Sequence, residues 1–330
     1  MRAPDADALA NRAALRPPAP GSPFVIWCPP PGWGFFANFL WVLDGISLAD
    51  RSGLTPVVDM QWHATRFNER RPVDGTTNAW EYYFAQPGAV SVAEAEAAGA
   101  HAHDGSLIRE FFWTPVDIEH DTRVHGELAA RGRALVERYI RVHPAILSSV
   151  DELLPRSRHD GVLGVHVRGT DLRRPTAGEH PIPPPAVEYL RAAMDLVQEH
   201  GYSKVYLACD EVETVDAFRV SEATKTRRGY RWWFGAKRPL HRYLLGREVL
   251  VDALALARCA TLLCGASNVP IAATLLAKEP PTLVGVPAVS ISTTREHWSR
   301  HLKRIPMSTF AAAQIRGWLG RRQRGGPPAL

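Results

Sequence analysis

Short apolar, β-branched runs alternate along this chain with longer segments whose apolar residues recur at helical spacing. The run Phe24–Cys28 predicts a strand, and a glycine-containing turn follows it. Apolar residues then repeat at helical spacing through Phe35–Arg51, until Ser52-Gly53 stops the pattern, and Leu54–Met60 predicts a second strand. This order of strand, glycine loop, helix and strand is typical of the opening of a βαβ unit.

The second half of the chain repeats this alternation with a sharper contrast. The predicted strands there are Val162–Val167, Lys204–Ala208, Thr261–Cys264 and Thr282–Val286. The predicted helices are Ala186–His200, a segment ending near Phe218, Glu248–Ala257 and Val269–Ala277, after two earlier ones at Gly126–Tyr139 and Pro144–Leu154. Strands that alternate with helices at this pitch predict an α/β protein with parallel, doubly wound sheets.

The length of 330 residues exceeds the usual size of a single hydrophobic core, which predicts two domains. Residues 155–160 are polar and contain proline, so we place the boundary there. We expect residues 1–22 to be a disordered lead rich in Ala and Pro, 23–155 a first Rossmann-like domain, and 156–330 a second one with a basic tail.

Composition describes an ordinary globular protein with 45% hydrophobic and 22% charged residues. A net charge of +5 suits an anionic small ligand, and the chain lacks the aromatic-interleaved basic runs of RNA-binding proteins, so no nucleic acid partner is expected. The four cysteines show no CxxC pairing and lie in or beside apolar runs, which predicts buried thiols. With no signal-peptide pattern and no bilayer-length apolar run, a cytoplasmic location is expected.

Three segments have two open interpretations each. The aromatic residues of 61–115, including Trp80, Tyr82 and Trp113, are first expected to pack in a core, and alternatively to form a wall for sugar rings. The basic segment Thr224–Arg247 contains no acidic residue and is either a solvated face or a loop over an anionic ligand. The basic C-terminal tail either contacts acidic lipid, at the inner face of a membrane, or frays.

Polar side chains follow three predicted strands of the second half. They are His166, Arg168 and Asp171 after the first strand, Asp210 and Glu211 after the next, and Ser267 and Asn268 after the third. Because the carboxyl ends of parallel strands meet at one sheet edge, we expect these groups to share one cleft. Arg168 and the helix start at Asn268 suit a diphosphate, and the carboxylates suit nucleoside hydroxyls. No DxD triplet follows any of these strands, and no cluster at metal-ligand spacing accompanies them, so no metal site is predicted.

Three peptides resemble a known family in order and spacing. Gly164–Asp171, then Val205–Glu211, then Asp252 ahead of Gly265–Val269 are similar to the three motifs of the GDP-fucose-dependent fucosyltransferases. The α1,6-fucosyltransferases look most similar, with the α1,2- and protein O-fucosyltransferases as wider relatives. The resemblance spans about Val162 to Ala277, with a looser match to a glycine-and-asparagine loop at Gly32–Asn38.

This resemblance implies a GT-B-like fold of two Rossmann-type domains facing a cleft, and an inverting transfer of fucose from GDP-β-L-fucose without a metal or cofactor. The first domain would then face the acceptor, with Trp80, Tyr82 and Trp113 on that side. Arg168 would bind the pyrophosphate, Asp252 would lie near guanine or ribose, and Asp171 would lie near the sugar. The implied donor-binding residues are Gly34, Asn38, His166, Arg168, Gly169, Asp210, Glu211, Asp252, Ser267 and Asn268. The implied catalytic residues are Arg168, Asp171 and Glu179, with Asp171 or Glu179 as general base.

The chain departs from the α1,6 pattern at two cationic positions. Gly169 and Leu172 stand where those enzymes have Arg and Lys, so positive charge must come from Arg173, Arg174 or Thr224–Arg247, or be absent. Two alternatives therefore stay open: a GT-B transferase that uses another nucleotide sugar, and a nucleotide-sugar or glycan-binding protein without catalysis. The acceptor would be an oligosaccharide, a polysaccharide or another compound with a hydroxyl group.

Overall fold

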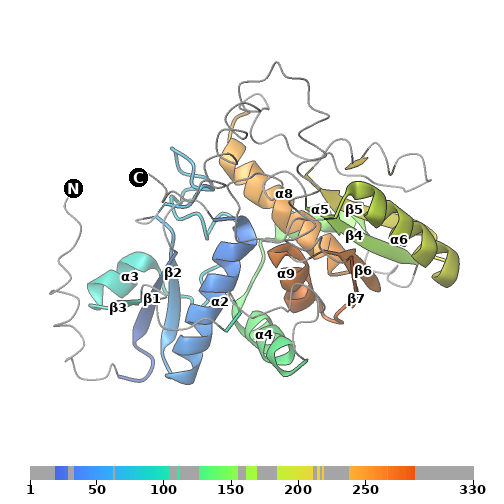
Figure 1. Cartoon of the computed structure of the whole chain (residues 1–330). Coiled ribbons are helices and arrows are strands. Elements are labelled where there is room, and N and C mark those ends of the chain that lie inside the picture. Colours follow the sequence, from blue (N-terminus) through green and yellow to red (C-terminus); the bar gives the residue numbers. More distant parts are fainter. Residues whose placement is uncertain are drawn as a thin grey trace, which may run out of the picture.

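Two parallel β-sheets, separated by a layer of helices, form the framework of the protein (Figure 1). The computed structural model describes residues 19–28, 33–61, 64–103, 110–111, 126–154, 161–168, 184–210, 214–215, 218, 238–265 and 267–286. The first sheet has the order β2-β1-β3 and the second the order β5-β4-β6-β7. The predicted α/β class with parallel sheets is confirmed, because all five pairings between the strands that the structure describes are parallel.

The strands follow the apolar runs of the sequence closely, except for one short strand of the first sheet that contains two histidines. In the first sheet they are β1 (Pro23–Trp27), β2 (Thr55–Asp59) and β3 (His101–His103). In the second sheet they are β4 (Val162–Val167), β5 (Lys204–Cys209), β6 (Thr261–Cys264) and β7 (Thr282–Gly285). All six residues of β4 are buried, as expected of a central parallel strand covered on both faces.

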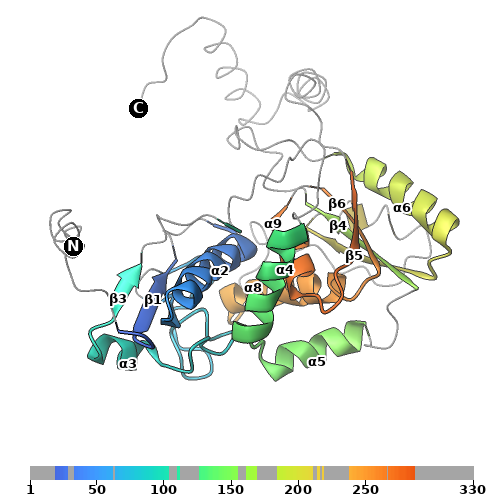
Figure 2. The ribbon, with the colours of Figure 1, turned by 90° about the horizontal axis from the view of Figure 1, so that it is seen from below.

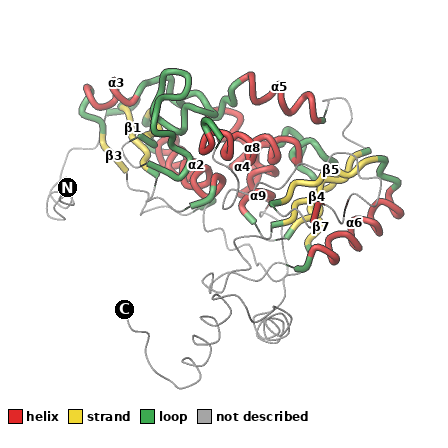
Figure 3. Tube along the Cα trace, turned by 90° about the horizontal axis from the view of Figure 1, so that it is seen from above, coloured by secondary structure: helices red, strands yellow, loops and turns green. Residues whose placement is uncertain are grey.

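Helices form three layers around the two sheets (Figures 1 and 2). The outer face of the first sheet is covered by α3 (Val92–Ala97), and the outer face of the second by α6 (Ala186–His200). The helices between the sheets are α2 (Phe35–Arg51), α4 (Gly126–Tyr139), α8 (His241–Leu256) and α9 (Asn268–Leu276), and α5 (Pro144–Leu153) packs along α8. The tube view of Figure 3 shows the same separation of the two sheets by helices.

The main hydrophobic core is shared by both halves of the protein. It extends from Phe24 in β1 to Ala277 after α9, and it includes buried residues of α2, α8 and both sheets. Smaller clusters lie between the second sheet and α6, and between the first sheet and α3. Burying the central helices on both sides therefore holds the two sheets in one packed unit.

Local stop signals end several helices where the sequence predicts. After α2, Gly53 adopts φ +66°, and after α6 the left-handed cap is Gly201 at φ +68°. Glycine tolerates this conformation without the clash that a Cβ would cause. The predicted bounds of α2, α4, α6 and β4 agree with those observed.

One helix boundary differs from the prediction, and two short elements were not predicted. The segment 61–115 contains α3 and β3. Helix α8 begins at His241, seven residues before the predicted start at Glu248. The last residues of the basic segment Thr224–Arg247 therefore belong to this helix. The proposed boundary at 155–160 and most of the N-terminal lead lie outside the described residues, as does the C-terminal tail.

Candidate functional site

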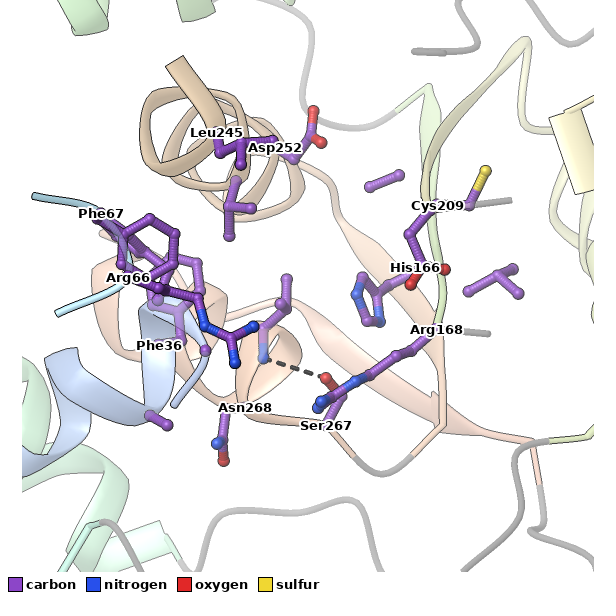
Figure 4. A pocket seen from close by; sticks show the side chains of 18 residues that line it. Phe36, Arg66, Phe67, His166, Arg168, Cys209, Leu245, Asp252, Ser267 and Asn268 are labelled. Atoms are coloured by element: carbon purple, nitrogen blue, oxygen red, sulfur yellow. Dashed lines mark hydrogen bonds between the residues drawn. The ribbon is translucent and has the colours of Figure 1, made fainter. Parts of the chain in front are cut away.

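A cavity of about 180 Å³ lies between the two halves of the protein. The first half contributes the start of α2 and the loop after β2. The second half contributes the ends of β4 and β5, one face of α8 and the start of α9. Figure 4 shows the side chains that line it, which are Gly34, Phe35, Phe36, Ala37, Arg66, Phe67, His166, Val167, Arg168, Ala208, Cys209, Asp210, Leu245, Val249, Asp252, Ser267, Asn268 and Val269.

Parallel pairing brings two of the predicted strand ends together. His166 of β4 pairs in register with Ala208 of β5, and Val167 pairs with Cys209. Arg168 and Asp210 directly follow the ends of these two strands, so both emerge at the same sheet edge and both line the cavity. The predicted convergence of these strand ends is therefore observed.

The third strand end presents a helix start to the same cavity. Ser267 is the N-cap residue of α9, and its Oγ accepts a hydrogen bond of 3.4 Å from the backbone N–H of Val269 (Figure 4). The side chains of Arg168 and Ser267 lie close to one another in this view. A guanidinium beside a helix N-terminus favours an anion, because the unpaired N–H groups and the helix dipole both attract negative charge.

Asp252 reaches the cavity from α8 and is held by a tyrosine of β5. The hydroxyl of Tyr206 donates a 2.8 Å hydrogen bond to Oδ1 of Asp252, and both side chains are buried. This bond sets the rotation of the carboxylate relative to the sheet. An ionised carboxylate only accepts hydrogen bonds, so Asp252 suits a ligand that presents N–H or O–H donors.

His166 is neutral in the folded protein at neutral pH. Only 7% of its surface is exposed, and burial, with a smaller contribution from the nearby charge of Arg168, lowers its pKa from 6.5 to about 3. Its Nδ1 is buried and has no hydrogen-bond partner among the described residues. Leaving such a group unpaired costs about 1–3 kcal/mol, a cost that a bound ligand with a matching group would remove.

Arg66 is a cavity residue that the sequence analysis missed. It lies in the loop after β2 and extends from the first half of the protein toward His166 and Arg168 (Figure 4). The signal available was weak, since Arg66 belongs to no motif and lies in an aromatic segment, seven residues beyond the end of β2. The basic segment that we expected to supply charge behaves differently where it is described. There, Arg238 pairs with Glu248, Arg242 binds the carbonyl oxygen of Asn68, and Arg247 binds Ser149.

Asn38, a predicted donor-binding residue, does not line this cavity. It lies one turn into α2, is 4% exposed, and borders a smaller cavity of about 20 Å³ together with Phe39 and Trp80. Gly34, at the start of the same helix, does line the main cavity. Asn38 lies one helical turn further along α2 than Gly34, beyond the main cavity and among core residues of the first half.

Trp80 and Tyr82 are core residues, as the packing interpretation predicts. Trp80 is 1% exposed, its ring centroid lies 4.4 Å from that of Phe84, and its indole N–H donates to the carbonyl oxygen of Ala85. Tyr82 is 3% exposed and packs edge-on against Tyr243. Neither lines the cavity between the halves.

The other predicted site residues lie outside the described residues. They are Trp113, Gly169, Asp171, Glu179 and Glu211, together with Leu172, Arg173 and Arg174. Their proposed roles stay predictions.

The cysteines are buried free thiols, as predicted. Burial raises the pKa of Cys259 and of Cys264 to about 12, and it raises the pKa of Cys28 further, with Asp59 adding to the shift. These three thiols are therefore protonated at neutral pH and are poor nucleophiles.

Among the residues that the structure describes, no cluster of three or more His, Cys, Asp or Glu side chains has an arrangement that would hold a metal ion. In the same part of the chain, none of the helices combines the length and the apolar character needed to cross a bilayer.

Solved structures of fucosyltransferases are similar to this chain in fold. The α-1,6-fucosyltransferase NodZ soaked with GDP-fucose matches over 77% of this chain and 92% of its own, with 20% identity and a TM-score of 0.44. Fucosyltransferase NodZ from Bradyrhizobium matches with 18% identity over 77% and 93% of the two chains and a TM-score of 0.46. POFUT1 in complex with GDP matches with 11% identity over 81% and 98%, and a TM-score of 0.47.

No protein-family model and no curated protein sequence matches the chain. At these identities and TM-scores the structural similarities carry no functional conclusion. The function of this chain therefore has to follow from the cavity and from the sequence motifs that line it.

Proposed function

We propose that this protein is a glycosyltransferase that moves a sugar from a nucleoside-diphosphate sugar to a hydroxyl group of an acceptor. The observation that carries this proposal is the convergence in one cavity of Arg168, the α9 N-terminus, His166 and Asp252. One side of this set attracts a diphosphate, and the other accepts hydrogen bonds from a nucleoside. A nucleotide sugar presents both features in one molecule.

The phosphate side rests on Arg168 and on Ser267-Asn268. A guanidinium can bind two phosphate oxygens at once, and the helix start adds backbone N–H donors and the positive end of a dipole. As the sugar leaves, the bond between its anomeric carbon and the phosphate oxygen breaks and the diphosphate gains negative charge. One well-placed donor in such a site stabilises that charge by on the order of 3 kcal/mol. These groups can stabilise the charge without a metal ion, and we therefore propose that the reaction needs none.

The nucleoside side favours guanine. Guanine presents an N–H and an amino group on one edge, and the carboxylate of Asp252 is an acceptor that can bind both. A neutral His166 adds one donor and one acceptor without a repelling charge. The sugar itself is assigned from the motif resemblance of Gly164–Asp171, which favours L-fucose from GDP-β-L-fucose.

The reaction is an in-line displacement with inversion. The acceptor hydroxyl attacks the anomeric carbon on the face opposite the diphosphate, a general base takes the hydroxyl proton, and GDP departs. Asp171 and Glu179 are the candidates for the base. Acceptors in this proposal are oligosaccharides, polysaccharides or other hydroxyl compounds.

The test measures nucleotide binding and sugar transfer with the full chain. Calorimetry should show tighter binding of GDP than of UDP or ADP, and incubation with GDP-fucose should release GDP. An Arg168→Ala variant should lower turnover at least about a hundredfold while thermal unfolding stays near that of the wild type. The matched control is Arg191→Ala, which removes an exposed arginine of α6 that pairs only with neighbouring Glu188 in the described structure.

Three outcomes would contradict the proposal in different ways. Tighter binding of UDP or ADP than of GDP would indicate a transferase that uses another nucleotide sugar as its donor. Tight GDP binding without hydrolysis or transfer to any acceptor would indicate a binding protein. Near-wild-type turnover in Arg168→Ala would show that the phosphate assignment is wrong.

A further inference from the structure

Arg66 reaches the proposed donor cavity from the wall opposite Arg168. It belongs to the first half of the protein, whereas Arg168 and the α9 start belong to the second (Figure 4). We infer that Arg66 is a second phosphate-binding arginine, which closes the diphosphate site across the two halves. This inference rests on the proposed function and adds a residue that no motif of the chain contains.

The backbone on either side of Arg66 is fixed by buried hydrogen bonds. Oδ1 of Asn68 accepts from the backbone N–H of Thr65 at 2.6 Å and from its hydroxyl at 2.9 Å. The Asn68 amide group donates to the carbonyl oxygen of Met60 at 2.6 Å and to that of Thr77 at 3.1 Å. The loop that carries Arg66 is therefore tied both to the end of β2 and to the following segment.

Apolar packing against the start of α2 also holds the same loop in place. Phe67 is 7% exposed, lines the cavity, and packs edge-on against Phe35 at a centroid distance of 5.3 Å. Phe35 begins α2, so the loop is packed against the start of that helix. With its neighbours on both sides held, Arg66 has little backbone freedom to lose when a ligand binds, which favours affinity.

Contacts from the same loop also hold α8, the helix that carries Asp252. Oε1 of Glu69 accepts hydrogen bonds from the backbone N–H of Arg242 at 2.6 Å and of Tyr243 at 3.0 Å. In return, Nη1 of Arg242 donates to the carbonyl oxygen of Asn68 at 3.1 Å. The position of Arg66 is thereby coupled to that of the proposed nucleoside-binding helix.

The chemistry of the cavity favours a diphosphate between the two arginines. A nucleoside-diphosphate sugar carries two negative charges, and one more develops on the diphosphate when the sugar bond breaks. The walls of the same cavity include Phe36, Phe67 and Val249, and apolar walls strengthen a charge-assisted hydrogen bond by excluding water. Two guanidinium groups from opposite walls would match the charge of the bound donor.

The test compares a phosphate-containing ligand with a phosphate-free one. For Arg66→Ala we expect GDP to bind about tenfold to a hundredfold more weakly, and guanosine to bind within about twofold of the wild-type affinity. Arg66→Lys keeps the charge but loses the planar fork, so its GDP affinity should fall between those of Arg66→Ala and the wild type. The control is Arg70→Ala, an exposed arginine of the same loop, which should change neither affinity.

Each result decides the inference. Unchanged GDP binding in Arg66→Ala overturns it and leaves the proposed function standing. The inference is also overturned if Arg66→Ala weakens the binding of GDP and of guanosine equally. It is overturned as well if Arg66→Lys loses as much GDP affinity as Arg66→Ala and unfolds at a lower temperature. Either result assigns Arg66 a structural role. If the wild-type protein binds guanosine and GDP equally well or binds neither, the proposed function fails, and the inference fails with it.

Discussion

Burial decides the charge state of the histidine in the candidate site. His166 sits at the end of β4, 7% exposed, and its folded-state pKa of about 3 lies well below the ordinary value of 6.5. A sequence pattern can place a histidine at a strand end, but the lost hydration that makes it neutral depends on the helices and loops packed around it. A neutral ring can face a guanine without repelling Arg168.

This shift predicts a pH dependence of stability. Below pH 6.5 the unfolded chain binds a proton at His166 that the folded protein binds only near pH 3, so the free energy of unfolding falls as the pH falls between these values. At pH 5 the loss is about 2 kcal/mol relative to pH 7. A His166→Gln variant should lose this component, and urea denaturation at several pH values measures it.

The wild type and His166→Gln are compared by how steeply the free energy of unfolding changes with pH. The absolute free energies are not compared, because the substitution also changes packing. The matched control is His200→Gln, since His200 is an exposed residue at the end of α6. The control should keep the wild-type slope. Equal slopes for the wild type and His166→Gln would contradict the assignment of a depressed pKa to His166.

At the scale of elements, helix α8 shows why one boundary was predicted wrongly. Its first turns contain Arg242 and Arg247, which the sequence analysis assigned to a basic segment. The helix starts there because a residue far away in sequence caps it. Glu69, 173 positions before Arg242, accepts from the N–H groups of Arg242 and Tyr243. These are orphan donors of the first turn, and a carboxylate there also faces the positive end of the helix dipole.

Removing this cap should loosen the start of α8. We expect Glu69→Ala to lower the free energy of unfolding by about 1 kcal/mol and to speed hydrogen exchange at residues 241–246. Glu69→Gln keeps an acceptor and should lose less. Glu152→Ala, at an exposed glutamate of α5, is the control, and exchange at 241–246 as slow in Glu69→Ala as in this control would contradict the capping role.

Helix α3 was missed although its sequence contains a recognisable start signal. Ser91 and Glu94 form a capping box, in which Ser91 Oγ accepts from the N–H of Glu94 and the Glu94 carboxylate accepts from the N–H of Ser91. The helix has six residues, too few for a clear apolar period. Its short length is the reason why the capping box was the only local signal for it.

For the whole molecule, the shared core implies that the two halves depend on one another. The contact between them is tight at Gly246 of α8, where an added Cβ would overlap the hydroxyl and ring of Tyr83. Tyr83 has little room to move, since it is 2% exposed, stacks on Tyr243, and donates a 3.0 Å hydrogen bond to the carbonyl oxygen of Tyr243.

We therefore expect Gly246→Ala to destabilise the protein even though alanine is the better helix former. The overlap should cost about 1–3 kcal/mol, more than the gain in helix propensity of up to about 1 kcal/mol. Calorimetry should show one unfolding transition at a lower temperature, because the halves share a core. Gly126→Ala is the control, since a Cβ there meets nothing within 4 Å. Two separate transitions would show that the halves unfold independently.

The sequence alone determined the alternation of strands and helices and the strand-end groups of the second half. Apolar periodicity reports which face of an element is buried, and the change from apolar to polar at Val167-Arg168 marks a strand end. These features are local, and parallel pairing then brings Arg168, Asp210 and Ser267 to one sheet edge, as the sequence predicts.

Only the tertiary structure decided what faces that edge. It directs Asn38 into the core, buries Trp80 and Tyr82, and brings Arg66 into the cavity. The position of Arg66 depends on the hydrogen bonds of Asn68 and on the cap that Glu69 forms on α8. The cap joins residues 173 positions apart in the chain, and no local pattern of apolar and polar positions encodes it.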